Sequence, residues 1–129
     1  MGTWGSGNFD DDTAADYLAG VIDRLVTEVA DVMAGDPIEL EPDEYWGVAI
    51  PCQLELLCHL ARGGYDGGRL PDPSVIAEWK RRYLAVWDSG IDELEPSAQF
   101  KADRLKVLNR TFDELAEAAA HRLADRAPT

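Results

Sequence analysis

The sequence predicts an all-α fold: a single-domain antiparallel bundle of about four helices, preceded by an irregular glycine-rich segment. Apolar residues recur at three- and four-residue steps over four stretches of the chain, which is the period of a helix with one buried face. No stretch alternates apolar and polar residues for long enough to form a sheet. The connections between the four stretches are short, and short connections favour antiparallel neighbours.

The length and composition agree with one folded domain. A chain of 129 residues is long enough for one domain and too short for two. Apolar residues make up 46% of it and charged residues 29%, so a core can form and the composition is not that of a disordered chain. We expect residues 1–129 to form one helical domain, with residues 1–10 as a plug segment at one end and residues 126–129 as a frayed tail.

The first helix is predicted by an amphipathic stretch of about six turns. Gly35, Asp36 and Pro37 are typical of a helix stop, so the helix should end just before them. An acidic connector follows over residues 39–44. The apolar face of this helix comprises Ala14, Leu18, Ile22, Leu25, Val29 and Val32.

The second helix should run from about Asp43 to Arg62 and be the most buried element, because few of its residues are polar. Pro51 lies inside this stretch. Proline has no amide hydrogen and crowds the preceding turn, so we expect either a kink near residues 48–51 or two shorter helices. A glycine-rich loop over residues 63–68 follows.

Two further helices complete the predicted bundle. Asp72 and Pro73 are typical of a cap and a first turn, and Gly90 should end the third helix. Ser97 is placed to cap the fourth. The apolar residues are Val75, Ile76, Trp79, Tyr83, Val86 and Trp87 in the third helix, and Leu105, Leu108, Phe112, Leu115, Ala119 and Leu123 in the fourth.

The charge of the chain is strongly negative and unevenly distributed. The 25 acidic and 12 basic residues give a net charge of −13. Residues 1–60 contain 13 acids and one base, Arg24, whereas residues 61–129 contain 12 acids and 11 bases. Such a surface argues against nucleic-acid binding and serves either solubility or the attraction of a basic protein partner. The residues proposed to meet that partner are Asp16, Asp23, Asp31, Glu39, Glu41, Asp43 and Glu44.

The two cysteines and the hydropathy of the chain predict its location in the cell. Cys52 and Cys58 point about 240° apart on a helix, so they cannot bridge each other, and we expect buried thiols in a reducing cytosol. No segment is long and apolar enough to cross a membrane, and the first residues lack the basic-then-apolar pattern of a signal peptide. These observations predict a cytoplasmic protein with no membrane partner.

The opening segment carries two large aromatic residues between glycines and then three acids, directly before the first helix. Glycines permit a tight, irregular path. We expect Trp4 and Phe9 to plug the end of the bundle, and Asp10 or Asp11 to cap the helix. The alternative is that the aromatic residues form an exposed recognition patch.

This segment resembles the start of a bacterial family, the domain-of-unknown-function family numbered four thousand two hundred fifty-nine. Its members open with Trp-Gly-x-Gly-x-Phe, followed by Asn-Asp, an alanine, an aspartate and an aromatic residue. Asp11 stands where the family usually has Asn, and Tyr17 where Trp is frequent. The resemblance implies a small helical bacterial domain and assigns no catalytic residue. The matching positions here are Trp4, Gly5, Gly7, Phe9, Asp12, Ala14 and Asp16.

Two pairs of residues could bind a metal ion. Glu55 with His59, and Glu117 with His121, each lie four residues apart and therefore on one helix face. Carboxylate-bridged metal proteins place such pairs on facing helices, but with a three-residue step and additional carboxylates. Because the spacing differs, we interpret the pairs as structural and expect no cofactor.

No pattern in the sequence nominates a catalytic residue. The leading hypothesis is a non-enzymatic acidic interaction module, of the kind that serves as an immunity or inhibitor protein for a basic partner. The alternative is a small metal-dependent enzyme of unknown reaction. The charge asymmetry supports the first hypothesis, and the two Glu–His pairs support the second.

Overall fold

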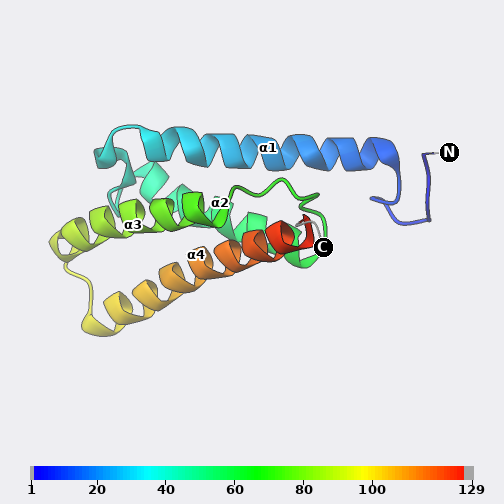
Figure 1. Cartoon of the computed structure of the whole chain (residues 1–129). Coiled ribbons are helices and arrows are strands. Elements are labelled where there is room, and N and C mark those ends of the chain that lie inside the picture. Colours follow the sequence, from blue (N-terminus) through cyan, green and yellow to red (C-terminus); the bar gives the residue numbers. More distant parts are fainter. Residues whose placement is uncertain (1, 127–129) are drawn as a thin grey trace.

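The computed structural model describes residues 2–126, with side chains described up to His121. It is the predicted all-α bundle (Figure 1), and successive helices run in opposite directions. The rest of the predicted frayed tail, residues 127–129, lies outside the described residues. The helices are α1 (Asp12–Ala34), α2 (Tyr45–Arg62), α3 (Pro73–Gly90) and α4 (Ala98–Arg126), with short 3-10 helices η1 (Pro37–Leu40) and η2 (Ile91–Leu94).

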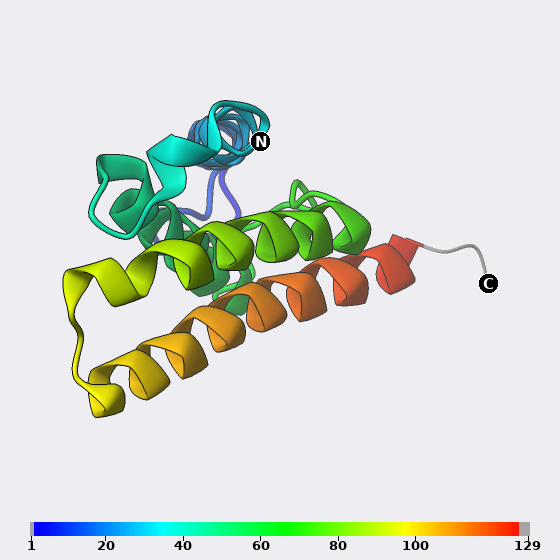
Figure 2. The same ribbon diagram turned by 90° about the vertical axis from the view of Figure 1, so that its left-hand side faces the viewer.

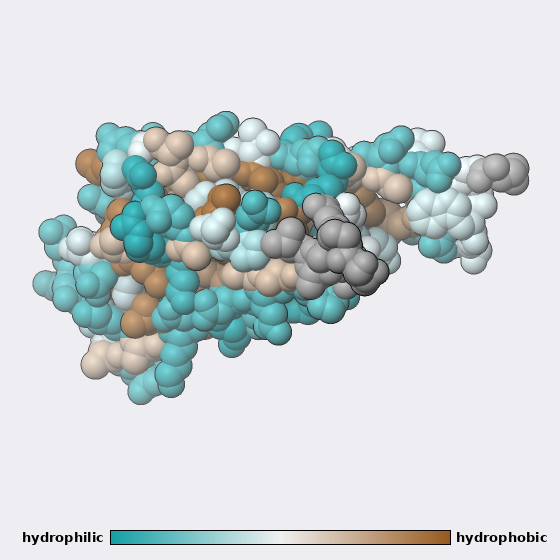
Figure 3. Space-filling model, in the orientation of Figure 1, coloured by the Kyte–Doolittle hydropathy of each residue, from teal (hydrophilic) through white to brown (hydrophobic). Residues whose placement is uncertain are grey.

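Helix α4 packs against α2 and α3, and α1 lies across α2 and, to a smaller extent, α3 (Figure 2). Most residues of the predicted apolar faces belong to the core, which is dominated by aliphatic and aromatic side chains from all four helices. Val75 and Leu105 are exposed instead, so their predicted burial is wrong. The side chain of Leu123 lies outside the described residues. Hydrophobic residues reach the surface along the seam between α1 and α3, and much of the rest of this face is hydrophilic (Figure 3). The fully buried aliphatic residues include Ile22, Val29, Leu40, Ile50, Leu54, Leu57, Ile76, Leu108 and Leu115.

The helix caps agree with the sequence at two ends and differ at one. The Asp11 carboxylate accepts hydrogen bonds from the amides of Thr13 and Ala14, as predicted. The Ser97 hydroxyl accepts the amide of Phe100 at 3.1 Å. Asp72 is the N-cap of α3 and Pro73 lies in its first turn, as predicted, but the backbone carbonyl of Asp72 rather than its carboxylate accepts the first-turn amides.

Helix α2 is continuous through Pro51, so the predicted alternative of two shorter helices is wrong. Proline has no amide to donate to the carbonyl four residues earlier, which belongs to Gly47. The Tyr83 hydroxyl donates to that carbonyl at 2.5 Å. A side chain from α3 therefore replaces the hydrogen bond that Pro51 removes from α2.

Gly47 also allows the chain to pass closely over α2. A Cβ atom at this position would lie 1.9 Å from the carbonyl oxygen of Glu41. Only glycine permits that approach. The contact places the acidic turn after η1 directly over the first turn of α2.

The two cysteines differ in their surroundings. Cys58 is buried, its thiol donates to the Thr111 carbonyl at 3.7 Å, and burial raises the pKa of this thiol to about 11. Cys52 is exposed, so its predicted burial is wrong. It lies on the side of α2 that faces away from the core. Over the described residues, no helix is both long and apolar enough to cross a membrane.

Candidate functional site

The residues before α1 form a loop held by backbone hydrogen bonds. The Trp4 amide donates to the Asp10 carbonyl at 2.8 Å, and the Asp12 amide donates to the Gly2 carbonyl at 2.7 Å. Residues 2–12 thus turn back on themselves, and the loop lies beyond the first turn of α1 (Figure 1). We call residues 2–12 the N-terminal loop.

Aspartate side chains brace this loop from within. The Thr3 hydroxyl donates to the Asp11 carboxylate at 2.8 Å, and the Trp4 indole N–H donates to Asp12 at 2.9 Å. The hydrogen bond from Thr3, followed by that from the Thr13 amide, holds the pKa of Asp11 below its ordinary value. The carboxylates of Asp11 and Asp12 are therefore occupied by the loop itself.

Asp10 lies close to Gly5 and Gly7, the two glycines between Trp4 and Phe9. A Cβ atom at Gly5 or at Gly7 would lie 2.7 Å from a carboxylate oxygen of Asp10. The Gly7 amide donates to the same oxygen at 3.0 Å. A side chain at either glycine would push this carboxylate out of its present position.

The predicted plug is wrong as regards Trp4. Its side chain is 61% exposed, and Phe9 is 37% exposed, so neither belongs to the buried core. The N-terminal loop lies beyond the first turn of α1 and not within the bundle (Figure 1). Phe9 packs against Tyr65 with ring centroids 5.0 Å apart.

These aromatic rings line a cleft of about 370 Å³ between the N-terminal loop, the first turns of α1 and the loop after α2. We call it the signature cleft. Arg69 also lines it, but the guanidinium donates two hydrogen bonds to Asp23, at 2.8 and 2.6 Å. This pairing lowers the pKa of Asp23. The lining residues important here are Trp4, Phe9, Asp10, Asp16, Tyr65 and Arg69.

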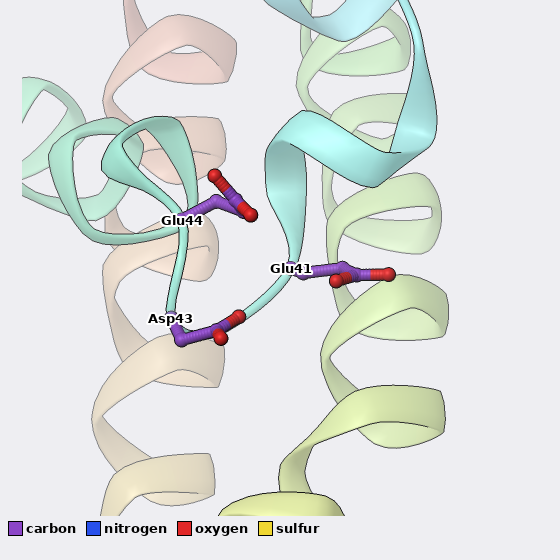
Figure 4. A group of neighbouring side chains, drawn as sticks. All are labelled: Glu41, Asp43 and Glu44. Carbon is purple, nitrogen blue, oxygen red and sulfur yellow. The ribbon is translucent and has the colours of Figure 1, made fainter.

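The acidic residues predicted to bind a partner are not gathered in one place. Asp16 lies near the start of α1 and Asp23 at its middle, whereas Glu41, Asp43 and Glu44 follow α1 and η1, before α2. These last three form a compact group around the turn between η1 and α2 (Figure 4), with carboxylate oxygens within 4.8 Å of one another. The remaining predicted residues, Asp31 and Glu39, are exposed.

The structure does not bring the two predicted Glu–His pairs together. Glu55 and His59 line a groove of about 350 Å³ between α2 and α4, where Glu114, not Glu117, faces them. Glu114 accepts a hydrogen bond from Arg62 at 2.6 Å. Among the described side chains, the one group of three close metal-ligating residues is Glu41, Asp43 and Glu44, which contains neither histidine.

Sequence reasoning missed two parts of the signature cleft. Tyr65 lies in the glycine-rich loop over residues 63–68, for which no function was predicted, and Arg69 follows it. Their approach to residues 4–16 depends on how α2 returns along α1, which periodicity does not predict. The sequence feature that could have indicated this part of the cleft is the aromatic residue within a glycine-rich loop.

The fold and the N-terminal loop define a small all-α bundle with an acid-braced aromatic signature at its start. A family model described as "Domain of unknown function (DUF4259)" matches residues 2–126. The chain belongs to this family, in agreement with the resemblance of its first 18 residues. Comparison with curated proteins and with solved structures finds no match.

Proposed function

We propose that this chain is a non-enzymatic interaction module of the bacterial cytoplasm whose acidic first half binds a basic protein partner, as an immunity or inhibitor protein does. Electrostatic attraction of this kind raises the association rate and favours partners of opposite charge. The proposal concerns the surface of α1, η1 and the turn after η1.

The distribution of ion pairs carries the proposal. Among the described side chains, Asp23 is the one carboxylate of residues 1–60 that forms an ion pair, and it binds Arg69. The other ion pairs join cations and acids within residues 61–129. Five cations of the second half therefore pair with acids of the same half, whereas Asp23 alone among the acids of the first half has a cationic partner in the described part of the chain.

Within that half, Glu41, Asp43 and Glu44 concentrate negative charge most strongly. Bringing three carboxylates within 4.8 Å of one another without a cation raises the local repulsion. A basic side chain of a partner would relieve it. The backbone of this turn is held by the close approach of Gly47 to Glu41 and by the hydrogen bond from the Glu44 amide to the Glu41 carbonyl at 2.9 Å.

The test is capture of a partner from the native cell by the tagged full chain at low salt and at ~0.3 M salt. The chain with Glu41→Lys, Asp43→Lys and Glu44→Lys should lose a basic protein that the unaltered chain retains at low salt. Capture should weaken at the higher salt, because exposed charge contacts are screened. Recovery of no basic protein at either salt would remove the proposal.

A matched variant controls for the change in net charge. Asp88→Lys, Asp103→Lys and Glu117→Lys alter exposed acids of the second half by the same amount. This control variant should still capture the partner. If both triple variants lose it equally, net charge rather than the acidic surface of the first half is responsible, and the proposal is wrong.

A further inference from the structure

We propose that the signature cleft binds an arginine side chain of a basic protein partner; the assignment deepens the proposed function and rests on it. The residues that carry it are the rings of Trp4, Phe9 and Tyr65 and the carboxylate of Asp16. They come from the N-terminal loop, the first turns of α1 and the loop after α2.

The first argument is that the aromatic rings are exposed and yet held in place. Trp4 is 61% exposed and Tyr65 42% exposed. The Trp4 indole is fixed by its hydrogen bond to Asp12, and its backbone by the bond from its amide to the Asp10 carbonyl. Exposed aromatic residues that are already ordered bind with little further loss of conformational entropy.

The second argument concerns charge. Asp16 lines the cleft, is exposed and forms no ion pair among the described side chains. Arg69 is the cation in the lining, and its charge is balanced by the two hydrogen bonds to Asp23. The cleft therefore combines aromatic faces with an available carboxylate, and a cation complements both.

Arginine fits this combination better than the other candidates. Its planar guanidinium stacks on aromatic faces and donates two parallel hydrogen bonds to a carboxylate, whereas lysine offers a compact and strongly hydrated charge. A neutral apolar side chain would leave Asp16 without a partner. An anion would meet Asp10 and Asp16 in the lining.

The test uses the full chain and three short peptides: acetyl-Gly-Arg-Gly-amide, the same peptide with citrulline in place of arginine, and the same peptide with leucine. Citrulline keeps the shape of arginine and removes its charge. The readout is the indole N–H resonance of Trp4 in a ¹H–¹⁵N spectrum, assigned with Trp4→Phe. The arginine peptide should shift this resonance in a saturable manner, and the other two should bind at least about fivefold more weakly. Equal binding of the citrulline or leucine peptide would overturn the proposal.

Variants separate the cleft from its surroundings. Asp16→Asn should weaken the arginine peptide about fivefold or more, as followed by the same indole resonance. Trp4→Ala should weaken it as strongly, as followed by the backbone amide resonances of residues 64–69. Tyr17→Ala removes an aromatic residue that is 65% exposed but does not line the cleft, so it should leave binding unchanged. Equal loss in all three variants would contradict the assignment to this cleft.

The outcome can be separated from that of the proposed function. If Trp4→Ala keeps the partner that Glu41→Lys, Asp43→Lys and Glu44→Lys loses, the cleft is not part of the interface and the proposed function stands. If the arginine peptide binds while the native cell yields no basic protein, the cleft stands and the proposed function fails.

Discussion

Three consecutive aspartates of the N-terminal loop make three different kinds of contact. Asp10 fills the space beside two glycines, Asp11 caps α1 and accepts the Thr3 hydroxyl, and Asp12 accepts the Trp4 indole. The cap could be predicted from the sequence, because position relative to a helix determines it. The other two contacts depend on the path of an irregular loop and could not.

The first prediction concerns Asp11. Replacement by alanine should lower the melting temperature, since two amides of α1 and the Thr3 hydroxyl lose their acceptor. The pKa of Asp11 is lowered in the folded state. Its stabilisation is therefore full above the unfolded pKa of ~3.9 and is lost as the pH falls through the folded pKa.

Melting curves of the unaltered chain and of Asp11→Ala between neutral pH and about pH 2 check this. The difference between the two should shrink as the solution becomes more acid. Asp11→Asn keeps a capping oxygen, so it should retain most of the stability and lose the pH dependence of this site. A difference that stays constant down to the acid limit would contradict the prediction.

A second residue-scale prediction concerns Gln53. The side chain is 9% exposed, and its amide oxygen has no hydrogen-bond donor among the described residues. A buried acceptor without a partner destabilises by about 1–3 kcal/mol. Gln53→Leu should therefore raise the free energy of unfolding by about 1 kcal/mol, as measured by urea denaturation. Gln53→Glu, which buries a charge in the same place, should lower it.

At the scale of elements, the sequence was sufficient for the helices and most of their ends, and insufficient for the contacts between them. The period of the apolar residues predicted all four helices, because burial of one face imposes it. Whether α2 stays continuous or divides at Pro51 was left open, since this depends on a backbone group that another part of the chain satisfies. For α2, that part is Tyr83 on the neighbouring helix.

The prediction for this contact is a coupling between Tyr83 and Pro51. Tyr83→Phe should destabilise the chain by about 1–2 kcal/mol, because the buried Gly47 carbonyl loses its donor. In a Pro51→Ala background, the amide of residue 51 can donate to the same carbonyl, so Tyr83→Phe should have a smaller effect.

Urea denaturation of the four members of this double-mutant cycle measures the coupling. The decrease in the free energy of unfolding caused by Tyr83→Phe should be at least about 0.5 kcal/mol smaller with alanine at position 51 than with proline. Tyr83 is buried, and its ring stays in place in Phe, so packing is nearly unchanged. Equal losses in both backgrounds would show that the hydroxyl does not replace the missing amide.

For the whole molecule, length and composition predicted one domain, and the positions of the charged residues predicted the uneven charge. Neither depends on how the helices pack. The candidate site was predicted only in part. Trp4, Phe9 and Asp16 belong to the N-terminal signature, but Tyr65 and Arg69 come from a loop that the fold brings beside them. The exposure of Trp4 could not be predicted either, because an irregular segment has no period that distinguishes an inner from an outer face.

The last prediction follows from the net charge of −13 and from the ion pairs of the side chains up to His121, in which Asp23 is the one acid of the first half. Raising NaCl from about 0.02 to about 0.3 M shortens the screening length from about 20 to about 6 Å. Repulsion between the unpaired carboxylates should weaken, and the melting temperature should rise.

Glu41→Lys, Asp43→Lys and Glu44→Lys each change the charge by two, so together they bring it to −7. This variant should melt with a smaller dependence on salt than Asp88→Lys, Asp103→Lys and Glu117→Lys, which reaches the same net charge. A melting temperature that falls with salt would show that ion pairs, not repulsion, dominate the electrostatics of the folded chain.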